Sequence, residues 1–169
     1  MTRQDQTYKW FIYSLGLLPI WILDALLLGR YSHLGTKPLL LVLAVVTVAV
    51  LEGSTAGAGF GLGVGIVWAL GYTGSSAIIL FLVLAGMMVG IVAQYALTQG
   101  FLGCLFCSAG AMAFLEGFHI LWGLFSQMAP AQVLLEIATG EFCITLLWTP
   151  LVYLIFRAIF HRVGLDKLA

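Results

Sequence analysis

The residues of this chain that could carry chemistry are a few polar side chains set in long apolar stretches. Glu116 and His119 lie three residues apart, so on a helix they share one face. A Glu-x-x-His pair is half of the metal site of some helical bundles, but such sites need a second copy, which this sequence lacks. We therefore interpret it first as a structural polar pair, with contact to a partner as the alternative, and predict no metal site.

The other acids differ in where they fall along the apolar stretches. Asp24 lies in the later part of the run 10–29, where a charge costs about 2.5–3.5 kcal/mol on membrane-insertion scales. It is a candidate intramembrane polar residue, either on an ion or substrate pathway or near the outer surface. Glu52, Glu136 and Glu141 lie near the ends of such runs, which favours ordinary helix-end groups.

Cys104 and Cys107 form a C-x-x-C motif, which indicates redox chemistry when it occurs near a βαβ unit. Here both lie within an apolar stretch, where burial makes thiols inert. No nucleophile with a base and no pair of catalytic carboxylates stands out. We therefore predict that the protein is not an enzyme and needs no cofactor.

The elements that must position these residues are apolar helices. The chain has 169 residues, of which 62% are hydrophobic and 8% are charged, and its mean hydropathy is +1.10. A soluble domain would have about 25% charged residues. Seven basic and seven acidic residues leave no net charge and no basic patch, which excludes nucleic acid as a partner. The composition predicts a protein that lives in a lipid bilayer.

Six apolar runs approach the roughly 20 residues that a helix needs to cross the hydrocarbon core. They predict an all-α integral membrane protein, with residues 1–169 forming one transmembrane domain, a compact bundle of about six helices. The boundary between the second and third runs is the least secure, because only the short segment Glu52-Gly53-Ser54-Thr55 marks it. The predicted spans are 10–29, 38–53, 54–71, 75–97, 101–125 and 135–160.

Basic residues near the span ends predict the orientation, since cytoplasmic loops are rich in Lys and Arg. Five basic residues flank the two chain ends, and two lie in the first loop. This balance predicts a multi-pass protein with both termini in the cytoplasm. The five are Arg3, Lys9, Arg157, Arg162 and Lys167, and the two are Arg30 and Lys37.

Glycines follow two rows of four-residue spacing along the third run. Such rows let a neighbouring helix approach almost backbone to backbone in a membrane. Because the two rows lie on nearly opposite faces, we expect this helix to be central and packed from both sides. The candidates for helix packing or partner contact are Gly53, Gly57, Gly61 and Gly65 in one row, Gly59 and Gly63 in the other, and Gly86 and Gly90 in the fourth run.

Residues 38–162 resemble the MreD family of bacterial rod-shape proteins. The resemblance rests on a short second span, on G-F-G-L-G-V-G-I-V-W at 59–68, and on a Gly/Ser turn at 71–76. It continues through a span with two glycines, a span with an internal acid in A-F-L-E-G-F-H, and the aromatic and basic ending F-R-A-I-F-H-R. Glu116 matches the internal acid of the family, whereas Ala69 stands where the family often has an acid.

The resemblance implies a non-enzymatic scaffold of the elongasome in the bacterial cytoplasmic membrane. Its implied partners are an MreC-like bitopic protein and the complex of a SEDS glycosyltransferase with a class B penicillin-binding protein. Its implied function is support of sidewall peptidoglycan synthesis and cell shape. The implied fold is similar to the S-components of ECF vitamin transporters. The alternative function is therefore that of a substrate-binding S-component or another small solute transporter, which would need a polar pocket near the outer face.

Overall fold

The computed structural model describes residues 3–31, 38–71, 77–95, 100–126 and 130–165, and every regular element in these ranges is an α-helix. This confirms the predicted all-α class. The helices are α1 (Arg3–Tyr31), α2 (Leu40–Glu52), α3 (Ser54–Gly71), α4 (Ala77–Tyr95), α5 (Phe101–Phe125) and α6 (Ala131–Leu165).

Four of these helices, α1, α4, α5 and α6, are long and apolar enough to cross a membrane. This fits a multi-pass membrane protein. The other two, α2 and α3, are apolar but shorter. With 13 residues, α2 is about 20 Å long, well short of the roughly 30 Å of a hydrocarbon core. The sequence predicted six spans. Of the six described helices, four have spanning length and two fall short.

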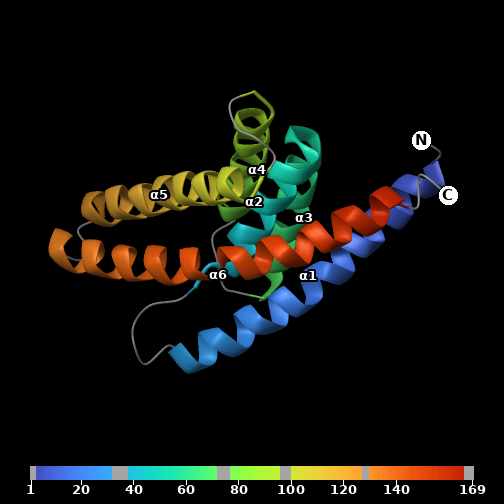
Figure 1. Cartoon of the computed structure of the whole chain (residues 1–169). Helices are drawn as coiled ribbons and strands as arrows, with labels where there is room; N and C mark the ends of the chain where they lie inside the picture. The colour runs from blue at the N-terminus through green and yellow to red at the C-terminus, as the bar shows by residue number, and fades with distance from the viewer. Residues whose placement is uncertain (1–2, 32–37, 72–76, 96–99, 127–129, 166–169) are drawn as a thin grey trace.

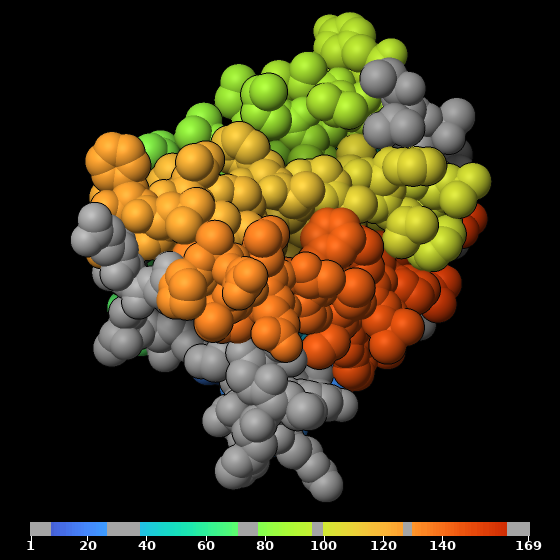
Figure 2. Space-filling view, turned by 90° about the vertical axis from the view of Figure 1, so that its left-hand side faces the viewer, coloured from blue at the N-terminus to red at the C-terminus, as the bar shows by residue number. Residues whose placement is uncertain are grey.

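The helices do not form one parallel bundle. In Figure 1, α5 and the first half of α6 run side by side and project to one side of the molecule, while α3 and α4 run across them. The second half of α6 packs along α1, so the start of α1 and the end of α6 meet at the opposite side. Figure 2 shows α4, α5 and the first half of α6 as successive bands on one face.

The core of the protein is α2. All of its residues from 40 to 51 are buried, and it contacts every other helix. A helix that is apolar on all sides must be enclosed by protein or by lipid. The sequence predicted the third run at the centre. The structure differs, because α2 is too short to cross a bilayer and buries its Val, Leu and Ala side chains against the other helices.

The predicted orientation depends on basic residues that lie mostly outside the described side chains, namely Arg3, Arg30, Lys37, Arg162 and Lys167. The remaining two are placed. Lys9 pairs with Glu52, and Arg157 lines a cavity beside Leu51. Both therefore lie near the carboxyl end of α2, and the side of the membrane that they face stays a prediction.

Candidate functional site

One glycine row of α3 packs directly onto its neighbours. A Cβ atom added at Gly57 would lie 2.6 Å from the carbonyl oxygen of Gly86 and 2.6 Å from the Cβ of Ala49. One added at Gly61 would lie 2.5 Å from the carbonyl oxygen of Leu82. Real Cβ atoms essentially never come this close to other atoms, so this row fits only because it has no side chains. It brings the backbone of α3 against α4 and α2.

The glycines of α4 form the other side of the same contact. A Cβ atom at Gly86 would collide with the carbonyl group of Gly57, and one at Gly90 would collide with the backbone of Ser54. At the far end of the same row, a Cβ atom at Gly65 would lie 2.9 Å from the Cα of Ile79. The α3 and α4 helices therefore form the closest helix pair of the protein, as expected for small residues that face one another.

The second glycine row is open. A Cβ atom at Gly63 would meet nothing within 4 Å among the described residues, and one at Gly59 would meet only the ring of Trp10, at 3.7 Å. Both glycines line a groove of about 350 Å³ between α1 and α3, which Trp10 and Trp21 flank on the α1 side. The expectation that both rows would be packed therefore differs from the structure, in which one row packs and the other faces a groove.

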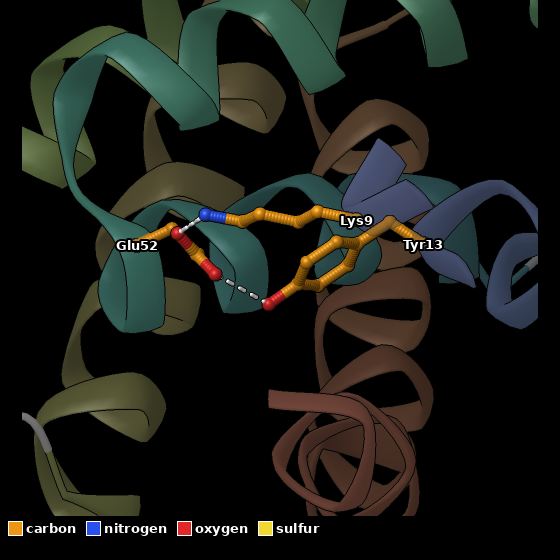
Figure 3. A network of polar contacts seen from close by, with 3 residues as sticks. All are labelled: Lys9, Tyr13 and Glu52. Atoms are coloured by element: carbon orange, nitrogen blue, oxygen red, sulfur yellow. Dashed lines mark hydrogen bonds and ion pairs between the residues drawn. The ribbon is translucent and has the colours of Figure 1, made fainter. Parts of the chain in front are cut away.

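The carboxyl end of α2 is fixed to α1 by a polar network. The Glu52 carboxylate forms an ion pair with Lys9 through one oxygen and accepts a 2.8 Å hydrogen bond from the Tyr13 hydroxyl through the other (Figure 3). The side chains of Lys9 and Glu52 are only 16% and 11% exposed. Sequence reasoning treated Glu52 as an ordinary helix-end group and missed this link, since 43 residues separate the two charges.

The turn from α2 to α3 needs glycine. Gly53 has a φ of +96°, in the region that favours glycine, and a Cβ atom there would also collide with the Gln94 side chain. Gly53 also contacts α4, since a Cβ atom at Gly90 would lie 2.7 Å from the Gly53 carbonyl carbon, but its conformation sets it apart from the rest of the first row. Its function is to reverse the chain within one residue, which keeps α2 and α3 as a tight hairpin.

The amino end of α2 is buried and is satisfied by side chains from two other helices. Asp24 of α1, which is 1% exposed, accepts a 3.4 Å hydrogen bond from the Leu40 amide. Thr145 of α6 accepts one of 3.1 Å from the Leu39 amide. A carboxyl group is favourable here, because the amino end of a helix carries partial positive charge. The described contact gives Asp24 a structural function at this helix end.

Glu116 lies in α5 with its carboxyl group turned toward α6. It is 7% exposed, and the Nδ1 atom of His119 is 4.0 Å from its Oε2 atom. Its Oε1 atom has no hydrogen-bond partner in the described part of the chain. The Glu141 carboxyl of α6 lies close enough to interact with it. Among the described residues, no group of three or more His, Cys, Asp or Glu could hold a metal ion.

Sequence reasoning missed the approach of Glu141 to Glu116. A signal for it was present, because the two acids precede and follow the segment 127–129 by nearly equal numbers of residues. Residues equidistant from the connection of an antiparallel helix pair lie side by side.

The two thiols of the C-x-x-C motif, Cys104 and Cys107, are buried and form no disulfide, and the Cys104 sulfur lies 3.6 Å from the Thr47 hydroxyl.

Comparison with known proteins gives no match: no family model, no curated protein and no solved structure is significantly similar to this chain. The resemblance to the MreD family therefore stays a prediction from sequence motifs.

Proposed function

We propose that this protein is a non-enzymatic, MreD-like scaffold of the bacterial cytoplasmic membrane. It docks the single transmembrane helix of an MreC-like bitopic partner, and through it serves the SEDS glycosyltransferase and class B penicillin-binding protein that build the sidewall. The observation that carries the proposal is the open glycine row of α3. Gly59 and Gly63 present a surface without side chains at the base of an apolar groove.

The groove suits a helix better than it suits a polar solute. Its lining is apolar apart from the Ser14 hydroxyl and the Trp10 and Trp21 indoles. In lipid, helices associate chiefly through close packing, and open glycines allow the closest packing. The row on the opposite side of α3 is already occupied by α4, so the helix keeps one glycine face for the fold and has one left for a partner.

The membrane arrangement that we propose has all six helices within one domain and both termini in the cytoplasm. Its support is the placement of Lys9 and Arg157 near the same end of α2. The short α2 is compatible with this arrangement, because it is enclosed by protein on every side and does not face lipid. The S-component-like bundle stays part of the proposal.

The test is co-purification of the full-length chain with a tagged MreC-like protein. A Cβ atom at Gly63 meets nothing within 4 Å among the described residues, so Gly63→Leu fills the groove and leaves the packed row intact, and we expect it to abolish co-purification. The matched control is Gly117→Leu on α5, since a Cβ atom at Gly117 also meets nothing within 4 Å among the described residues. Equal recovery of the partner with both variants would contradict the proposal.

The alternative, binding of a small solute, predicts a different result. A groove of about 530 Å³ between α4 and α5 is lined almost entirely by apolar side chains such as Phe81, Met88 and Phe114. It therefore offers no polar anchor for a vitamin-sized ligand. Native mass spectrometry that detects such a ligand on gently purified protein would favour the alternative.

A further inference from the structure

A third cavity lies where three helices end, away from both glycine rows. It has a volume of about 280 Å³ and lies between the carboxyl end of α2, the first residues of α5 and the last turns of α6. Gly100 and Phe101 line it at the start of α5, and Tyr153, Arg157 and His161 line it from α6. Unlike the two larger grooves, it has nearly as much polar as apolar lining.

The basic side chains of this cavity come from one face of α6. Arg157 and His161 are four residues apart, so they lie one above the other on the helix. The Arg157 guanidinium lies 5.8 Å from the centre of the Tyr153 ring, a cation–π contact that restricts its position. A guanidinium held in this way can donate two parallel hydrogen bonds to a phosphate group.

Among the residues that the structure describes, no acid lines this cavity. The nearest acid along the chain is Glu52, which follows Leu51, and its two oxygens already bind Lys9 and Tyr13. Arg157 therefore brings positive charge to a cavity in which the described lining residues carry no negative charge.

The start of α5 adds hydrogen-bond donors. Gly100, the N-cap residue, precedes the helix in an extended conformation and has no side chain that could cap the first turn. The first amides of a helix have no partner within the helix, and they lie at its positive end. These donors reinforce the attraction of the two basic side chains for an anion.

The level of the cavity along the apolar helices indicates where the anion comes from. The apolar stretch of α5 begins at Phe101 and that of α6 ends at His161, so the cavity lies at one end of both. Phospholipid phosphates lie at this level of a bilayer, and basic pockets between membrane helices bind anionic headgroups. We infer that the cavity binds a phosphate group, either of a phospholipid headgroup or of free phosphate.

The test uses the full-length protein in a neutral detergent, titrated with phosphatidylglycerol, phosphatidylcholine or inorganic phosphate and followed by native mass spectrometry. We expect saturable binding of phosphatidylglycerol or inorganic phosphate at one site. Arg157→Gln should weaken it by about tenfold or more, because a charge-assisted hydrogen-bond pair is lost. Arg157→Lys, which keeps the charge but not the planar fork, should weaken it less.

Two further measurements decide the outcome. The double variant Arg157→Gln with Glu136→Gln restores the net charge through an exposed acid near the other end of α6, and it should bind as weakly as the single variant. Competition by inorganic phosphate would identify free phosphate, and its absence would identify the lipid. Unchanged binding in the folded Arg157→Gln protein, or recovery in the double variant, would overturn the inference.

Discussion

The two glycine rows of α3 have the same four-residue spacing and opposite surroundings. At Gly61 an added Cβ atom would lie 2.5 Å from a backbone oxygen of α4, whereas at Gly63 it would meet nothing within 4 Å among the described residues. The two positions are one helical half-turn apart. Their difference teaches that glycine spacing marks a surface where a helix can approach, while the rest of the fold decides whether one has approached.

The largest effect should come from the same substitution on the two rows. Gly61→Leu forces a whole side chain into the backbone of α4, a cost above the roughly 1–3 kcal/mol of ordinary overpacking, so we expect loss of the folded protein. Gly63→Leu should leave unfolding within about 0.5 kcal/mol of wild type. Size-exclusion profiles and unfolding in mixed micelles measure both. Comparable behaviour of the two variants would remove the distinction between the rows.

A smaller effect should show that the packed row is a mutual contact. Gly57→Ala and Gly86→Ala should each destabilise the protein by about 1–3 kcal/mol, because each new methyl group meets the carbonyl group of the other residue. Their effects should not add, since the two glycines share one contact. A double-mutant cycle on the free energy of unfolding measures the coupling. Strict additivity would show that the two sites are independent.

The open row should be sensitive to the helix on the other side of its groove. Glu52→Gln removes the ion pair that fixes α1 to α2 and leaves the ammonium group of Lys9 without its partner carboxylate. We expect a loss of about 1–2 kcal/mol in unfolding, moderated because a lysine can extend toward water. Glu136→Gln, at an exposed position of α6, is the control and should have little effect. If Glu52→Gln leaves the free energy of unfolding unchanged, contacts other than the ion pair hold α1 against α2.

The smallest effect should come from single cysteines placed in the open row, whose reaction rates report how accessible the groove is. In a Cys143→Ser background, which removes the exposed native thiol, Gly63→Cys should react with a small thiol reagent in detergent, because the groove is open. Gly59→Cys should react more slowly, since Trp10 lies beside it. Mass spectrometry of the labelled protein measures the rates. A partner bound in the groove should protect Gly63→Cys, and labelling that persists in the complex would place the partner elsewhere.

The positions of the helices were predictable because apolar runs and short polar breaks are local signals. The run 54–71 coincides with α3 and the run 101–125 with α5. The helix ends were less predictable. The residues before 10 contain neither Gly nor Pro, and only Gly164 interrupts the residues from 161 to 165, so α1 and α6 continue beyond their apolar runs.

The arrangement of the helices was not predictable, because it depends on contacts between distant residues. The glycine pattern suggested a central α3, yet the stronger signal was the run from Leu40 to Leu51, which has Thr47 as its only polar residue. The Thr47 hydroxyl is satisfied within the helix, because it donates a hydrogen bond to the Leu43 carbonyl. The pairing of Glu116 with His119 was predictable from their spacing. The cavity that Arg157 and His161 line was not, because it forms only where α6 meets the start of α5.

The way in which α2 begins also bears on the order in which the protein can be completed during synthesis. The amide of Leu39 finds its partner in Thr145, 106 residues later in the chain. Asp24, which precedes α2 in the chain, can accept from the Leu40 amide at once, but until α6 has been made the Leu39 amide lacks its partner and one side of α2 is open. The innermost element is therefore among the first to be synthesised and the last to be finished, so a chain that ends before Thr145 contains α2 without the environment that α2 requires.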